Sequence, residues 1–324
     1  MQLSEQPLSN VLRAAVIRGI GDWWSDKQRV QQQANAPSSP LYHYTDASGL
    51  LGIVKNQEIW FTNIFHLNDN DELSYGLRLA INMLRKIIDG SQSNEVRFFC
   101  EFFSDFVKRN YGTLFGFYVA SFSMARDDLG QWRAYAANGK GFALGLSPTL
   151  FDTQDKKNRK PHQNIFFSPV IYGEKAAIER LKEIIDRAVM VITEPASIAA
   201  YEGNHAVTCR FFYEVAVNLS SPILWHAVTS KHEAFQNERE MRLIIFGDRK
   251  KLKPYIEIRV RGGEFVPFIR SKMLVQAKDA ISEVVLGPST PEMIEDGLTM
   301  MLEGFGIKTN GKIERSAIPY RSLS

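Results

Sequence analysis

The sequence predicts an α+β fold built around a curved, largely antiparallel β-sheet. Short apolar and aromatic runs typical of strands are separated at irregular distances by segments with helical periodicity. No internal repeat is present. This irregular succession of strands and helices favours an antiparallel sheet surrounded by helices.

The composition is that of a folded protein. The 324 residues are 44% apolar, 11% aromatic and 23% charged, which excludes a disordered, collagen-like or coiled-coil chain. The net charge of +3 is too small for nonspecific binding of nucleic acid by net charge alone. The two cysteines, Cys100 and Cys209, exclude a disulfide scaffold and suit a reducing compartment. Because no apolar run is long enough to span a bilayer and the N-terminus lacks a signal-peptide pattern, we expect a soluble cytoplasmic protein without membrane contact.

Residues 1–39 differ in composition from the rest of the chain. Apolar residues recur at three- and four-residue spacing from Leu8 to Ile20, which predicts an amphipathic helix, and a Gln-, Ser- and Pro-rich stretch at 28–40 indicates a linker. We therefore expect an N-terminal helix and linker at 1–39 and one main domain at 40–324. The helix either packs on that domain, which is the more common arrangement, or faces a regulatory partner.

From residue 40 onward the element pattern is dense. Turn residues and period-two runs predict strands at 41–44, 59–62, 115–123, 141–146, 165–172, 238–246, 256–261, 266–268, 281–286 and 312–317. Helical periodicity predicts helices at 47–55, 71–88, 99–107, 129–137, 176–192, 202–217 and 291–302.

Three segments carry groups suited to chemistry. The first is the strand LYHYT at 41–45, in which Tyr42 and Tyr44 share one face while His43 and Thr45 share the other. His43 and Thr45 can present two hydrogen-bonding groups to one ligand. A core strand whose histidine bonds a backbone carbonyl is the alternative.

The second segment runs from Ser121, Phe122 and Ser123 into the predicted helix that holds Trp132 and Tyr135. Residues three apart on a helix lie on neighbouring parts of one face. Two such aromatic rings can hold a flat cationic ring by stacking and cation–π attraction. They can equally be part of the core.

The third segment is NEREMRL at 237–243. In a strand, Glu238, Glu240 and Arg242 share one face, and Met241 and Leu243 point to the core. An arginine beside two carboxylates can keep one of them ionised and oriented, and an ionised carboxylate stabilises a sugar oxocarbenium ion. A solvated strand face with alternating charges is the alternative.

Standard signatures of other chemistries are missing from the sequence. GKG at 139–141 lacks phosphate-loop spacing, and neither GxGxxG after a strand nor GxSxG occurs. His205 and Cys209 are four residues apart without a second ligand pair, so we expect no metal site.

Taken together, several segments resemble the bacterial domain of unknown function 2971 family over about residues 40–322. These segments are LYHYT at 41–45, WFTN at 60–63, LNDNDE at 67–72, SFS at 121–123, QWRAYAANGKGFALGL at 131–146, NEREMRLI at 237–244, VVLGP at 284–288 and SAIPYR at 316–321. That family in turn is similar to a divergent branch of the ADP-ribosyltransferase superfamily. The similarity consists of a His on the first strand, an aromatic-rich strand–helix unit and a Glu on a later strand.

This resemblance implies a split β-sheet that binds NAD. It implies that His43 bonds the adenosine-side ribose, that Tyr44 and Thr45 lie nearby, and that Phe122, Trp132 and Tyr135 frame the nicotinamide beside Ser123. Glu240 would be the catalytic glutamate that stabilises the oxocarbenium-like transition state. Glu238 would position the acceptor or act as its general base, and Arg242 would anchor the carboxylates or meet the pyrophosphate. The sequence does not decide which of Glu238 and Glu240 is the catalytic glutamate, nor which aromatic residue stacks on the nicotinamide.

We therefore expect an NAD-dependent ADP-ribosyltransferase that modifies RNA, DNA or protein. The resemblance implies a bacterial toxin or anti-phage effector. The composition shift at residue 39 suggests a regulatory partner such as an antitoxin, and the missing ligand pairs give no reason to expect a metal. A non-catalytic binding module on the same fold and an NAD glycohydrolase are the alternatives. The basic stretches at 156–160 and 249–253 can contact phosphates or be ordinary solvated loops, and Asn68 or Asn70 is expected to cap the helix at 71–88.

Overall fold

A computed structural model describes residues 7–67, 71–151, 160–276, 279–308 and 312–320. It has the predicted α+β architecture, with a mostly antiparallel sheet and surrounding helices. The expected caps Asn68 and Asn70 and the basic residues 156–159 lie outside the described residues. No helix in the described part of the chain is both long and apolar enough to cross a bilayer.

The chain forms two compact units, each assembled from three segments. Unit 1 comprises 1–33, 68–116 and 171–233, and unit 2 comprises 34–67, 117–170 and 234–324.

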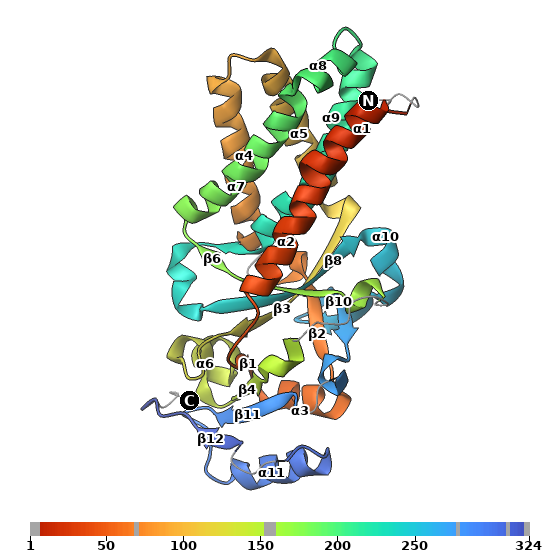
Figure 1. Cartoon of the computed structure of the whole chain (residues 1–324). Coiled ribbons are helices and arrows are strands. Elements are labelled where there is room, and N and C mark those ends of the chain that lie inside the picture. Colours follow the sequence, from red (N-terminus) through yellow and green to blue (C-terminus); the bar gives the residue numbers. More distant parts are fainter. Residues whose placement is uncertain (1–6, 68–70, 152–159, 277–278, 309–311, 321–324) are drawn as a thin grey trace. The chain divides into compact units, whose positions relative to one another are not determined.

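Unit 1 is helical (Figure 1). Its helices are α1 (Asn10–Val16), α2 (Trp23–Ala34), α4 (Asp71–Gly90), α5 (Asn94–Leu114), α7 (Glu174–Thr193), α8 (Pro195–Tyr201) and α9 (His205–Val228). Two short strands, β6 (Ile171–Tyr172) and β7 (Ser230–Lys231), form a separate parallel pair.

The predicted N-terminal amphipathic helix is present and packs on unit 1. It starts with Ser9 as the N-cap, and a π-helical turn, Ile17–Asp22, joins α1 to α2. Its buried apolar face contacts α7, α8 and α9. The predicted linker at 28–40 is wrong in its first half, because α2 continues to Ala34 and buries Gln28 and Gln32 against the unit.

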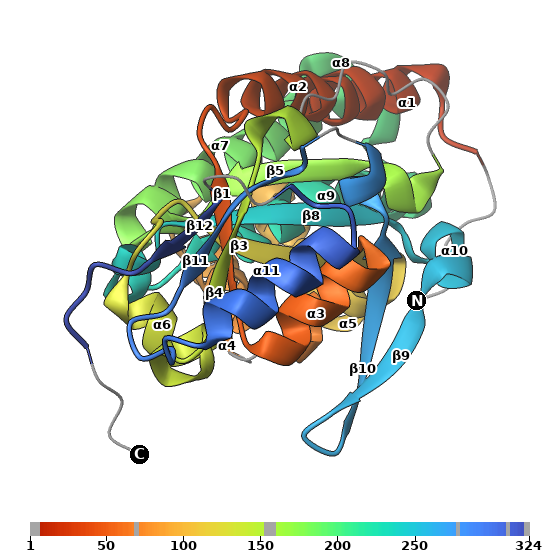
Figure 2. The same ribbon diagram turned by 90° about the horizontal axis from the view of Figure 1, so that it is seen from below.

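Unit 2 contains the main sheet (Figures 1 and 2). Its strands are β1 (Leu41–Thr45), β2 (Ile59–Asn63), β3 (Phe115–Ser123, which begins at the boundary of the units), β4 (Phe142–Leu146), β5 (Ile165–Pro169), β8 (Glu240–Asp248), β9 (Glu257–Arg261), β10 (Glu264–Ser271), β11 (Ile281–Leu286) and β12 (Ile313–Arg315). Its helices are α3 (Ala47–Asn56), α6 (Leu129–Tyr135), α10 (Arg249–Leu252) and α11 (Ile294–Gly304).

The sheet divides at β3. Along one path the strand order is β12-β11-β4-β1-β3-β2-β10-β9, and β3 also pairs with β8, which pairs with β5. β1 meets the end of β3 at Ser123, whereas β2 meets its middle at Tyr118 and Val119. β8 runs along both of these stretches, since Phe246 contacts Phe117 and the Arg239 carbonyl accepts from Met124 N. Because a strand has only two edges, β1 and β2 share one edge of β3 and must diverge. We call this place the fork.

Two apolar clusters cover opposite faces of the sheet. The larger contains Leu41, Phe122 and Met241 together with residues of α3 and α11. The smaller contains Tyr42, Tyr44 and Trp132 together with Ala136, Ala143 and Val285. The alternation predicted for 41–45 is therefore confirmed, because neighbouring residues of β1 enter different clusters.

Several other predicted elements have different bounds. The helix predicted at 99–107 is α5, from Asn94 to Leu114, and the strand predicted at 266–268 is β10, from Glu264 to Ser271. The strand predicted at 165–172 ends at Pro169, and 171–172 pair in unit 1 instead. The helix predicted at 202–217 extends to Val228 and includes Pro222, since nearly every residue of its last turns is buried. The strand predicted at 238–246 begins only at Glu240, because Arg239 has a φ of 44° and interrupts the extended backbone.

Unit 1 buries a polar cluster between α2, α7 and the end of α9. The His226 ring is 1% exposed, and neither of its nitrogens has a hydrogen-bond partner among the described residues. Its ring lies 6.0 Å from that of Trp24. Burial, together with the charges of Arg180 and Lys27, holds the pKa of His226 well below its ordinary value. Arg180 donates to Thr229 Oγ1 at 3.1 Å, and burial lowers its pKa to about 10.

We expect His226→Phe to raise the melting temperature in mild acid. The unfolded chain binds a proton at His226 near pH 6.5, whereas the native state does not, so stability falls as the pH drops below that value. A phenyl ring of similar size removes this loss, about 1.4 kcal/mol per pH unit at most, and removes two unsatisfied polar atoms. Thermal unfolding at several pH values measures the effect, with the exposed His205→Gln on the same helix as control. Equal acid sensitivity in His226→Phe and the parent would contradict it.

Candidate functional site

His43 lies at the fork. Its Nδ1 is 3.1 Å from the carbonyl oxygen of Ser121, the residue between the stretches of β3 that pair with β1 and β2. The imidazole therefore bonds a carbonyl at the point where the two strands diverge. Burial holds its pKa below the ordinary value, and the bond to Ser121 partly opposes this shift. This favours a neutral ring that donates from Nδ1.

The other two candidates on β1 serve packing and turns. Tyr44 OH donates to the Ala125 carbonyl at 2.9 Å and accepts from Asp128 N at 3.2 Å. Thr45 is buried, and Gly49 of α3 approaches it so closely that a Cβ there would lie 2.0 Å from Thr45 Oγ1. Tyr44 thus fixes the loop before α6, and Thr45 sets the start of α3.

Glu240 and Arg242 form a bidentate ion pair on β8. Arg242 Nε lies 2.7 Å from Glu240 Oε1, and Arg242 Nη2 lies 3.0 Å from Oε2. Both side chains are buried, at 8% and 1% exposure for the carboxylate and the guanidinium. This confirms that Glu240 and Arg242 share a face, opposite Met241, Leu243 and Ile245 in the core. Two parallel bonds fix the plane of the carboxylate.

Glu238 does not share that strand face. It is the last residue of a 3₁₀ segment, Glu233–Glu238, and the positive φ of Arg239 separates it from β8. Its carboxylate accepts from Tyr135 OH at 3.3 Å. The prediction that Glu238 is aligned with Glu240 and Arg242 on one strand is therefore wrong. Instead, Glu238 pairs with the exposed aromatic residue of α6.

Ser123 connects these pieces. Its hydroxyl donates to the Glu238 carbonyl at 2.8 Å and accepts from Ala125 N at 3.0 Å. Together with the bond from Met124 N to the Arg239 carbonyl at 2.9 Å, it fastens the end of β3 to the turn that precedes Glu240. A small hydroxyl at this position sets where both glutamates lie.

Phe122 and Trp132 are core residues. Trp132 is 0% exposed and meets Tyr44 edge-to-face at 4.8 Å, while Phe122 is 2% exposed in the larger cluster. Neither ring offers a free face for stacking in this structure. Tyr135, three residues after Trp132, is 40% exposed and is the aromatic candidate that a ligand can reach.

The structure brings together Ser123, Tyr135 and Glu238, with Glu240 and Arg242 two and four residues further along. It does not bring the His43 side chain beside Glu240. By strand alternation His43 lies on the face that carries Leu41 and Phe122, whereas Glu240 lies on the face opposite Met241. Among the described residues, no group of three or more His, Cys, Asp and Glu side chains gathers as a metal would require.

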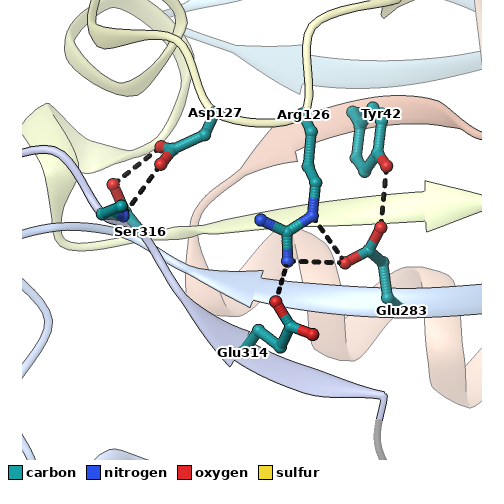
Figure 3. Close-up of polar contacts among 7 residues, drawn as sticks. Tyr42, Arg126, Asp127, Glu283, Glu314 and Ser316 are labelled. Carbon is teal, nitrogen blue, oxygen red and sulfur yellow. Dashed lines mark hydrogen bonds and ion pairs between the residues drawn. The ribbon is translucent and has the colours of Figure 1, made fainter.

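A polar network that the sequence did not indicate holds α6 in place (Figure 3). Asp127 accepts from Trp132 Nε1 at 2.6 Å, Ser316 Oγ at 2.7 Å and Ala317 N at 2.9 Å. Beside it, Arg126 pairs with Glu283 and Glu314. Glu283 also accepts from Tyr42 OH at 2.7 Å, and burial, with this carboxylate, raises the pKa of Tyr42.

Only part of this network has a sequence signal. Asp128 precedes a helical segment and caps it by accepting from Gln131 N. The partners of Asp127 are distant in the chain, so spacing cannot reveal them. The network fixes both ends of the 124–128 loop and thereby the direction of α6.

We expect Arg242→Met to destabilise the protein by about 3–5 kcal/mol, because it removes the guanidinium that binds both oxygens of a buried carboxylate. The double variant Glu240→Gln/Arg242→Met should lose much less than the sum of the single variants, since no buried charge then remains at the pair. Urea unfolding measures these differences. The exposed pair of Arg270 and Glu257 supplies the control, and Arg270→Met should cost at most about 1 kcal/mol. Additive losses in the double variant would contradict the coupling.

No curated protein and no solved structure matches the chain significantly. Residues 131–243 match the family model described as "Protein of unknown function (DUF2971)". This span contains most of α6, together with Glu238 and Glu240, and the match supports the resemblance to that family.

Proposed function

We propose that this protein is an NAD-dependent ADP-ribosyltransferase that modifies a macromolecule. One observation carries the proposal. A carboxylate fixed by a bidentate arginine, Glu240, lies two residues from a second carboxylate that bonds an exposed tyrosine, at the end of a strand where the sheet forks. The divided sheet and this pair of glutamates are what the superfamily resemblance leads one to expect.

In this proposal Glu240 stabilises the transition state of glycosidic cleavage. The bond between nicotinamide nitrogen and ribose C1′ breaks, and nicotinamide leaves with the electron pair. The ribose then carries developing positive charge, which a carboxylate with a fixed orientation stabilises without reorganising. Arg242 supplies that orientation.

Glu238 and Tyr135 are suited to the acceptor side of the reaction. Glu238 accepts a hydrogen bond from Tyr135 and is only half-buried. A nucleophilic group of the acceptor attacks C1′ and gives its proton to this carboxylate as general base. The partly exposed ring of Tyr135 provides a surface against which a flat group can stack.

For His43 we propose a structural role at the fork in addition to the ribose contact that the resemblance implies. Its bond to the Ser121 carbonyl supports a role in holding β1 and β3 together at the fork. Because His43 Nδ1 bonds the Ser121 carbonyl, the imidazole contacts a ribose hydroxyl through Nε2 in this proposal.

In this proposal the ADP-ribose is transferred to a macromolecule. The same proposal includes a biological role as a bacterial toxin or anti-phage effector that an antitoxin controls. Lys250, Lys251 and Lys253 around α10 are exposed, and Leu252 between them is buried. Exposed lysines on this short helix and directly after it suit contacts with nucleic-acid phosphates.

A binding module without turnover is the second candidate. The observation in its favour is the depth of the Glu240–Arg242 pair, since an arginine that occupies both carboxylate oxygens also competes with substrate for them. NAD hydrolysis uses the same residues as transfer, with water as the acceptor.

Incubation of the protein with labelled NAD and mixed RNA, DNA and bacterial lysate tests the proposal. We expect label on a macromolecule, and a loss of at least about a hundredfold in Glu240→Gln. Glu292→Gln, an exposed carboxylate outside this site, is the matched control. Because Glu240→Gln leaves the buried Arg242 without its carboxylate and lowers the melting temperature, circular dichroism must show that the variant is still folded at the assay temperature. This separates loss of chemistry from loss of fold. No labelled product and no stabilisation by NAD would favour the binding module without NAD.

Glu238→Gln separates transfer from hydrolysis. In this proposal Glu238 lies on the acceptor side, so we expect the variant to lose labelled macromolecule while it keeps release of nicotinamide from NAD. Glu292→Gln, outside the site, should keep both activities. Product analysis by chromatography measures the ratio of the two products. Parallel loss of both activities would instead assign Glu238 to the cleavage step.

A further inference from the structure

The β9–β10 hairpin of unit 2 extends beyond the strand that supports it. β10 pairs with β2 only through 268–271, whereas the hairpin turns at Gly262 and Gly263, both with positive φ. Figure 2 shows the hairpin reaching away from α3 and α11. Among the described strands, none pairs with its outer half on the β2 side.

One face of this outer half is apolar and exposed. Ile258, Val260 and Phe265 are 57%, 70% and 74% exposed, and Phe265 lies opposite Val260 in the pairing. Further along the same face of β10, Ile269 is fully buried in the core. Apolar core surface thus continues without interruption onto an uncovered hairpin, which is typical of an interaction surface.

The outer strand of the hairpin is also an edge. In the described part of the sheet β9 pairs with β10 alone and ends the strand order. The backbone groups along its other side can accept a further strand.

The sequence of β9, EIRVR, is complementary to itself when two copies run antiparallel. With Arg259 opposite its own copy, Glu257 faces Arg261 twice and Ile258 faces Val260 twice. Opposite charges then share one face and branched apolar side chains share the other. All five residues take part in this register.

The two central arginines do not oppose this pairing. Arg259 donates to Thr62 Oγ1 at 2.9 Å and lies over the rings of Trp60 and Phe268, 5.3 and 5.7 Å from their centroids. Its charge is thereby drawn along the hairpin toward β2 and away from the outer edge.

We propose that β9 pairs antiparallel with β9 of a second copy of this chain and joins the two sheets into one, with the exposed apolar faces of both hairpins forming its centre. Since one strand pair buries a small area, the association is weak and concentration-dependent.

Charge exchange across the pair tests this proposal. Glu257→Arg and Arg261→Glu each place like charges opposite one another twice in the homodimer. When the two variants are mixed, both pairs between positions 257 and 261 are again Arg with Glu, while Arg259 still faces Arg259. Sedimentation velocity of the full chain over a roughly hundredfold range of concentration is the measurement.

We expect the parent to dimerise, each variant alone to remain monomeric, and the mixture to form a one-to-one heterodimer. Val260→Lys should be monomeric, with Met293→Lys, at an 88% exposed position elsewhere, as the control that still dimerises. Unchanged circular dichroism of the single variants establishes their fold. A parent that is monomeric throughout, or variants that dimerise as it does, would overturn the proposal, as would nucleic acid or another protein occupying the hairpin of a monomeric parent.

Discussion

The two edges of β3 are the constraint on which unit 2 depends. A strand can satisfy two rows of backbone groups, yet three strands pair with β3, so two of them share one row and separate. The Ser121 carbonyl lies at that separation and is bonded by a side chain, His43. On the other edge, β8 runs uninterrupted and carries Glu240 to the same end of β3. The candidate site follows from this arrangement, because the strands that bear its residues meet only there.

The second constraint on the candidate site is the burial of two charged side chains. The Glu240–Arg242 pair is nearly inaccessible, and the opposite charge of each ion offsets part of the cost of burying the other. Such a pair contributes little net stability and much orientation. The neighbouring Glu238 is held by a tyrosine and remains half-buried. Two carboxylates two residues apart thus have unlike surroundings, as acid–base and electrostatic roles require.

Period-two alternation predicted the faces of β1 and the inward side of β8, because strand geometry alone decides which side chains share a face. Alternation could not predict the position of Glu238, because that position depends on a positive φ at Arg239. Residues with a side chain seldom adopt a positive φ. Helical spacing placed Trp132 and Tyr135 on neighbouring parts of a face, but that face lies at the rim of the core, so one is buried and the other is exposed. α9 extends beyond its predicted end at residue 217, because packing around Pro222 outweighs the helix-breaking tendency of proline.

Asp127 has a consequence for the order in which the chain is made. Two of its three donors, Ser316 and Ala317, come from residues 189 and 190 positions later. During synthesis α6 emerges early, but its anchoring carboxylate stays incomplete until these residues have left the ribosome. The direction of α6, and with it of the tyrosine that bonds Glu238, therefore depends on residues that are synthesised about 190 positions after Asp127.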